Sequence, residues 1–153
     1  MVAEKIEAAV RRLSDLEAIR ELAHRYAHCV WQKEISAVVG LFAEDGEMNT
    51  GDRPVIRGQR ALLESYQQML GAADFHPFVH NHLISLEGDS ATGTCYLDLR
   101  ATIDGESMIG SGYYDDEYVR VGGEWKFRAR KLTMCELVPL RDGQADRPPA
   151  PAR

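Results

Sequence analysis

The 153-residue chain has little cysteine, no long apolar run and no excess of positive charge. Its three cysteines, Cys29, Cys95 and Cys135, include no Cys-x-x-Cys pair, so we expect reduced thiols and a cytoplasmic protein. A net charge of -6 argues against the basic surface that nucleic-acid binding needs. No apolar run approaches the ~20 residues of a membrane helix, so we expect no membrane association.

The sequence also lacks the short motifs of common cofactor and nucleophile classes, such as GxSxG, the P-loop and GxGxxG. A metal site is an alternative, because His24 and His28 are four residues apart on a predicted helix while His80 and His82 share a predicted strand. However, the helical histidines lie off the apolar stripe and no HExxH motif accompanies them. We therefore expect neither a metal nor a cofactor.

The length predicts one domain, residues 1–140, followed by a proline-rich tail, residues 141–153. Apolar residues at helical spacing predict an amphipathic helix over residues 15–31, for which Ser14 and Glu17 supply a capping box. Residues 4–13 carry only a weak helical pattern. Shorter helices are expected from Ile35 to Phe42 and after Gly58.

The second half of the chain changes to a period of two. Residues 79–87, 91–103, 107–121 and 125–137 alternate between apolar and polar side chains, and Gly-Asp, Asp-Gly and Gly-Gly pairs separate them. Short strands are expected near residues 47–50 and 55–56. These elements predict an α+β fold, in which a curved mixed or antiparallel sheet wraps over three N-terminal helices and forms a cone with a central pocket.

The stretch from residue 75 to 87 holds three of the five histidines. Alternation from His80 onward places His80, His82 and Ile84 on one face, which we take as the inward face. An imidazole can take and give a proton near neutral pH. We therefore interpret His80 as the proton-transfer group of a cofactor-free site; a structural histidine between strand and helix is the competing interpretation.

Motifs spread over about residues 14–140 carry a family resemblance. They are residues 16–22 with Tyr26, residues 41–46, residues 56–58, residues 75–81, residues 87–91, residues 113–118 and residues 123–127. In this order they resemble the nuclear-transport-factor-2-like superfamily, in its SnoaL-like branch. The resemblance implies the cone-shaped fold, whereas the reaction stays open because the fold hosts several chemistries.

Within this superfamily the sequence looks most like a group of cofactor-independent lyases: scytalone dehydratase, bile-acid 7α-dehydratase and hexachlorocyclohexane dehydrochlorinase. The resemblance implies that His80 transfers the proton, that Arg130 stabilises developing negative charge and that Tyr26 hydrogen-bonds the leaving oxygen. Those enzymes orient the histidine with an aspartate. This sequence has Trp31 at that position, which adds a flat aromatic wall.

We therefore expect a lyase that removes water, halide or formaldehyde from a hydrophobic aromatic or polycyclic small molecule. A polyketide cyclase or isomerase, a non-catalytic binding module and the small subunit of an aromatic-ring dioxygenase are the alternatives. Inward parity assigns the walls of the substrate pocket to Trp31, Met48, Phe75, His82, Cys95, Leu97, Tyr114, Leu132 and Met134. The outward residues Tyr96, Asp98 and Arg100 are expected to form the interface of a homo-oligomer, a trimer before a dimer.

Overall fold

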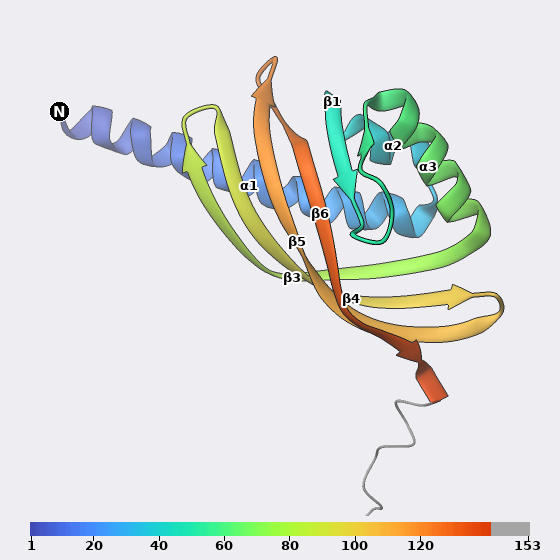
Figure 1. Cartoon of the computed structure of the whole chain (residues 1–153). Helices are drawn as coiled ribbons and strands as arrows, with labels where there is room; N and C mark the ends of the chain where they lie inside the picture. Colours follow the sequence, from blue (N-terminus) through green and yellow to red (C-terminus); the bar gives the residue numbers. More distant parts are fainter. Residues whose placement is uncertain (142–153) are drawn as a thin grey trace, which may run out of the picture.

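The computed structural model describes residues 1–141, which form helices covering one face of a strongly curved sheet (Figure 1). The predicted α+β fold is confirmed. The predicted tail after Arg141 lies outside the described residues. The elements are α1 (Val2–Gln32), α2 (Ile35–Gly40), β1 (Phe42–Asn49), β2 (Ile56–Arg57), α3 (Gln59–Ala72), β3 (Ala73–Glu87), β4 (Ser90–Ile103), β5 (Glu106–Val121) and β6 (Glu124–Pro139).

Helix α1 is longer than the sequence pattern indicated. Neither glycine nor proline interrupts it, so the two predicted halves form one helix and the predicted cap at Ser14 is wrong. The half from Ile19 to Val30 packs its apolar face on the body, whereas the residues before Ser14 are exposed and extend past the sheet (Figure 1). The helix ends at Gln32, and the left-handed φ of 57° at the capping residue Lys33 lets the Lys33 amide donate to the Val30 carbonyl at 3.2 Å.

The strands form one mixed sheet in the order β2-β1-β6-β5-β4-β3. Strands β3 to β6 pair antiparallel in sequence order, and β1 pairs parallel with β6. The turns at Asp104–Gly105 and Gly122–Gly123 have positive φ at both central residues, as tight hairpins with the right-handed twist require. The hairpin turns expected from the sequence are confirmed.

Strand β1 begins earlier than predicted. The apolar pattern extended the second helix to Phe42, but α2 ends at Gly40 and β1 starts at Phe42. Gly46 lies inside β1 where the register with β6 shifts, and a Cβ there would come 2.9 Å from the Ala43 carbonyl oxygen. The turn signal at this glycine therefore marks a bulge within a strand.

Edge strand β3 contains a bulge that changes which side chains face inward. The register with β4 shifts between Val79 and His82, so that His80 and Asn81 together stand opposite Tyr96. Before the bulge the odd-numbered residues face inward, and after it the even-numbered residues do. The predicted common face of His80 and His82 is therefore wrong, because that prediction assumed an unbroken strand.

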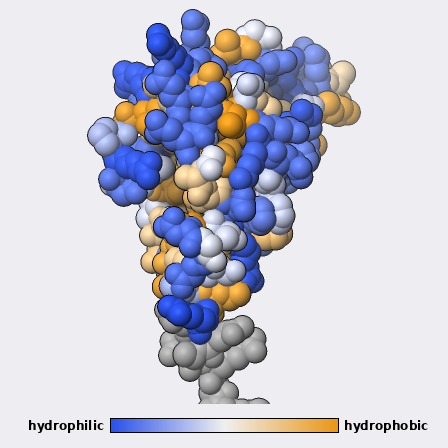
Figure 2. Space-filling model, turned by 90° about the vertical axis from the view of Figure 1, so that its right-hand side faces the viewer, coloured by the Kyte–Doolittle hydropathy of each residue, from blue (hydrophilic) through white to orange (hydrophobic). Residues whose placement is uncertain are grey.

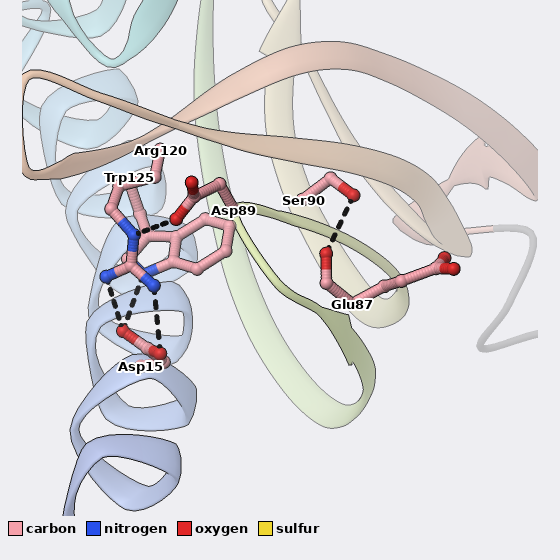
Figure 3. A network of polar contacts seen from close by, with 6 residues as sticks. All are labelled: Asp15, Glu87, Asp89, Ser90, Arg120 and Trp125. Carbon is pink, nitrogen blue, oxygen red and sulfur yellow. Dashed lines mark hydrogen bonds and ion pairs between the residues drawn. The ribbon is translucent and has the colours of Figure 1, made fainter.

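A network of ion pairs fastens α1 to the end of the sheet (Figure 3). Arg120 donates from Nη1 and Nη2 to the two carboxylate oxygens of Asp15 at 2.7 and 3.0 Å, and from Nε to Asp89 at 2.9 Å. The Trp125 indole donates to Asp15 at 3.1 Å, and its ring centroid lies 4.7 Å from the guanidinium carbon. We call these four residues the rim clasp. All three side-chain nitrogens of its arginine are satisfied.

One hydrophobic core lies between the helices and the sheet. Ile19, Leu62 and Phe127 are 0% exposed. Because a buried tyrosine needs a partner for its hydroxyl, the composition of this core predicts polar contacts inside it. The tyrosines concerned are at most 4% exposed and come from both layers: Tyr26, Tyr66, Tyr114 and Tyr118.

The surface at the α3 end carries hydrophilic side chains interspersed with smaller hydrophobic patches, and it tapers toward the end of β6 (Figure 2). No single hydrophobic patch dominates this face. Within residues 1–141, no helix is long and apolar enough to cross a membrane.

Candidate active site

An arginine–aspartate pair lies inside the core. Arg130 on β6 and Asp116 on β5 are 1% and 3% exposed. Arg130 donates from Nε and Nη2 to the two oxygens of Asp116 at 2.9 and 3.1 Å. Burying two charges is costly even when they are paired, so a pair at this position calls for an explanation beyond stability.

Aromatic rings surround the guanidinium of Arg130. Its central carbon lies 3.6 Å from the ring centroid of Tyr114 and 4.4 Å from those of Tyr26 and Phe127, within cation–π distance. Burial acts to lower the pKa of Arg130, but the Asp116 carboxylate together with Tyr114 and Tyr26 outweighs it, and the pKa is raised. The arginine therefore keeps its charge. Its buried Nη1 has no hydrogen-bond partner among the described residues, so one donor is unused.

The aspartate continues into a hydrogen-bonded relay that ends at His82. The Tyr118 hydroxyl donates to Asp116 Oδ2 at 3.0 Å and lies 2.8 Å from His82 Nε2. Since that hydroxyl hydrogen points to the carboxylate, the hydroxyl oxygen accepts from Nε2–H. The hydrogen of the neutral ring is thereby assigned to Nε2, and Nδ1 keeps its lone pair. This Nδ1 is buried and has no partner in the described part of the chain.

The surroundings of His82 keep its imidazole neutral. The pKa of His82 is lowered to about 4, chiefly by burial; Asp116 acts in the opposite direction, while Arg130 and the α1 residues Arg20 and His24 contribute to the lowering. At neutral pH, Nδ1 is therefore a free base. If it took a proton, the Asp116 carboxylate would stabilise the charge through the intervening tyrosine, as the aspartate of a serine protease stabilises its imidazolium directly.

The relay geometry depends on the missing side chain at Gly93. A Cβ there would lie 3.2 and 3.3 Å from the Cε2 and hydroxyl oxygen of Tyr118, and 2.6 Å from the Leu83 carbonyl oxygen. A larger residue would displace either the tyrosine or strand β3. Gly93 therefore leaves the space that the tyrosine needs to reach both of its partners.

Tyr26, whose ring contacts Arg130, is hydrogen-bonded to a second tyrosine. The hydroxyl oxygens of Tyr26 and Tyr66 are 2.6 Å apart. Burial raises the pKa of both groups, so both hydroxyls stay protonated. The tyrosine expected to act beside the histidine is thus inside the core, and its hydrogen bond goes to a second tyrosine.

His80, which the sequence indicated as the proton-transfer residue, lies on the outer face of the sheet. Its side chain is 51% exposed, and Nε2 is 2.9 Å from Oδ2 of Asp98, which is 61% exposed. The predicted inward placement of His80 is wrong, because the bulge turns the residue outward and gives the inward position to His82. Asp98 faces outward as expected.

Most of the predicted pocket walls face the core. Cys95 is fully buried, and burial raises the pKa of its thiol to about 11, so it stays protonated. This environment agrees with a space-filling role for the thiol and not with a nucleophile. The inward wall residues, buried or partly buried, are Met48, Phe75, Cys95, Leu97, Tyr114, Leu132 and Met134.

Trp31 is the exception among the predicted walls. It is 36% exposed, stacks on His76 with ring centroids 4.0 Å apart and donates its indole N–H to the Pro77 carbonyl at 2.7 Å. It lies at the surface between α1 and β3, so its prediction as a wall of the interior pocket is wrong. There it lines a surface hollow of about 400 Å³ with His24, Ala27, His28, Gln32, Pro77, Phe78 and Val79. We call it the α1–β3 hollow.

The five histidines occupy four places. His24 and His28 line the α1–β3 hollow, His76 stacks on Trp31, His80 faces outward and His82 faces the core. Across residues 1–141, no three or more His, Cys, Asp or Glu side chains are grouped so as to hold a metal ion.

Sequence reasoning missed Asp116 and Tyr118, although a signal was present. Both follow Tyr114 at steps of two on β5, and Tyr114 was predicted to face inward. The same alternation predicts that all three side chains enter the core. An aspartate and a tyrosine at core-facing positions of one strand are the sequence features that indicate a buried polar site.

A model of the SnoaL-like domain family matches residues 11–131, so the chain belongs to that family. Among solved structures it is similar to a protein of unknown function from Mycobacterium tuberculosis, with 26% identity and a TM-score of 0.77 over 85% of this chain and 77% of that one. It is also similar to a proposed scytalone dehydratase from Novosphingobium aromaticivorans, with 21% identity and a TM-score of 0.74 over 84% and 89% of the two chains.

A type 2 hexachlorocyclohexane dehydrochlorinase is a third similar structure, with 18% identity and a TM-score of 0.81 over 86% of this chain and 92% of that one. No curated protein matches the sequence. These likenesses show a fold that is shared with enzymes and with proteins of unknown function. What this chain does has to be argued from its own residues.

Proposed function

We propose that this protein is a cofactor-independent lyase that acts by proton transfer on a hydrophobic, aromatic small molecule, with His82 as the general base. The observation that carries the proposal is the relay Asp116–Tyr118–His82, which leaves a neutral imidazole with an unpartnered Nδ1. A structural histidine is expected to use both ring nitrogens, because an unsatisfied buried polar atom costs about 1–3 kcal/mol.

In the proposed reaction, each of the two unpartnered atoms, His82 Nδ1 and Arg130 Nη1, has its own role. His82 Nδ1 removes a proton from a carbon next to a carbonyl group, and Arg130 Nη1 hydrogen-bonds the oxygen on which negative charge then develops. The C–H electron pair forms the new double bond as the leaving group departs from the neighbouring carbon. When water is lost, the proton on Nδ1 passes to the departing oxygen and the imidazole returns to its neutral form.

The test uses two histidines of the same strand. Wild-type protein is incubated with β-hydroxy aryl ketones in D₂O, and NMR follows both deuterium exchange next to the carbonyl and formation of the conjugated enone. We expect His82→Gln to lower the rate by about 100-fold or more, because general-base catalysis typically contributes 10²–10⁴-fold. Tyr118→Phe removes the link to the carboxylate and should also lower it.

His80→Gln is the matched control, since it removes an imidazole two residues away that faces solvent. It should retain wild-type rates. Equal losses in His80→Gln and His82→Gln would contradict the assignment of the base. Binding of these ketones with neither exchange nor elimination by the wild type would favour the non-catalytic binding module instead.

The pH dependence provides an independent check. Because the pKa of His82 is lowered to about 4, the base is unprotonated above that pH. The acid limb of kcat/KM should therefore have its midpoint near pH 4 rather than near the ordinary histidine value of about 6.5. A midpoint at the ordinary value would indicate an exposed histidine as the base.

A further inference from the structure

The first turns of α1 form a helical arm that no other described residue covers. Val2, Ile6, Val10 and Leu13 are 72%, 59%, 56% and 64% exposed, and this part of α1 extends beyond the sheet (Figure 1). We call these four residues the arm stripe. Helices of this length are marginal in water without a packing partner, and exposed apolar side chains at helical spacing mark an interaction surface.

The arm stripe faces away from the body of its own chain. Val10 and the buried Tyr26 are 16 residues apart, which at 3.6 residues per turn places them about 160° apart around the helix. The same count places the arm stripe in line with His24, His28 and Trp31, the α1 residues of the α1–β3 hollow. One outward side of α1 therefore carries an aliphatic stripe at one end and an aromatic hollow at the other.

The hollow has the chemistry to receive the stripe. Its floor and walls include Ala27, Trp31, Pro77, Phe78 and Val79, and the two aromatic rings are 36% and 46% exposed. Trp31 is held in place by its stack on His76 and by its hydrogen bond to a backbone carbonyl. An apolar surface with fixed side chains suits aliphatic groups, because burying each one gains about 1.5–3 kcal/mol.

We propose that two copies of this chain pair through antiparallel α1 helices, with the arm stripe of each copy in the α1–β3 hollow of the other. The stripe is centred near residue 7 and the α1 side of the hollow near residue 28. A two-fold axis near residue 17 therefore brings each onto the other, so that Ile6 meets His28 and Val10 meets His24. The interface is self-complementary and closed, as a dimer of this symmetry requires.

Placement is tested by a disulfide in the full chain with Cys135→Ser, which removes the exposed native thiol. Ile6→Cys combined with His28→Cys should give a covalent dimer on mild oxidation. The two positions are about 33 Å apart within one helix, so they cannot link inside one chain. The single variant Ile6→Cys should not cross-link, because its two copies lie equally far apart; cross-linking of the single variant, or none in the double variant, would overturn the pairing.

Association is tested by sedimentation equilibrium. Ile6→Glu with Val10→Glu should weaken the dimer by about 100-fold or more, since two buried aliphatic side chains are replaced by charges. Ala8→Glu adds one glutamate to the opposite side of the arm and should leave the dimer intact. A monomeric wild type at 100 µM, an unaffected Ile6→Glu/Val10→Glu variant, or a dimer that dissociates on Tyr96→Glu at the outer sheet face would each refute the proposal.

Discussion

Two arginine–aspartate pairs, whose arginines lie on the neighbouring strands β5 and β6, show how the same chemistry serves different purposes. In the rim clasp, Arg120 and Asp15 have side chains that are 26% and 14% exposed, and every nitrogen of the arginine is bonded. In the core, the side chains of Arg130 and Asp116 are 0% exposed, and the arginine keeps one unused donor. The arginine of the clasp has no nitrogen left over for a ligand. The core pair does, and its aspartate also holds the relay to His82.

The largest effect is expected from Asp116→Asn. The substitution leaves the Arg130 charge buried without a carboxylate, and breaking one side of a buried ion pair costs about 3–5 kcal/mol. The free energy of unfolding, measured with urea, should fall by this amount, and any turnover should be lost as well. A loss below about 1 kcal/mol would mean that water already reaches the pair, and the contrast with the rim clasp would disappear.

Gly93→Ala should have an intermediate effect, which tests the relay more directly. The added methyl would come 2.6 Å from the Leu83 carbonyl oxygen and 3.2 Å from the Tyr118 ring, so we expect a loss of about 1–3 kcal/mol in stability. Displacement of Tyr118 should also lower kcat more than it raises KM. Gly71→Ala is the matched control in α3, where a Cβ meets no atom within 4 Å, and it should be neutral or slightly stabilising.

The smallest effect is expected from Asp15→Asn in the rim clasp. The amide keeps the shape and one acceptor but loses the charge, so the stability should fall by about 1 kcal/mol while activity stays at the wild-type level. Because Arg120 is partly exposed, 1 M NaCl should reduce this loss, whereas the effect of Asp116→Asn should hardly depend on salt. If Asp15→Asn lost activity under conditions in which all of the protein is folded, the rim clasp would also be needed for the active site.

The candidate site divides into a part that the sequence indicated and a part that it did not. The family resemblance assigned Arg130 to the site, and the structure buries it on β6. Strand alternation failed at His80, where a bulge in β3 reverses the parity within two residues. Whether a bulge forms depends on how two strands pair, and the sequence of one strand says little about the residues opposite it.

The sequence by itself determined the order of elements, the tight hairpins and the mixed apolar and aromatic core, since these follow from periodicity and from residues that accept positive φ. Only the tertiary structure decided which histidine enters the core, that Tyr118 joins it to Asp116, and that the first turns of α1 lie free of the body. The reason is physical. Periodicity is a property of neighbours along the chain, whereas burial, pKa and unpartnered donors depend on groups that only folding brings together.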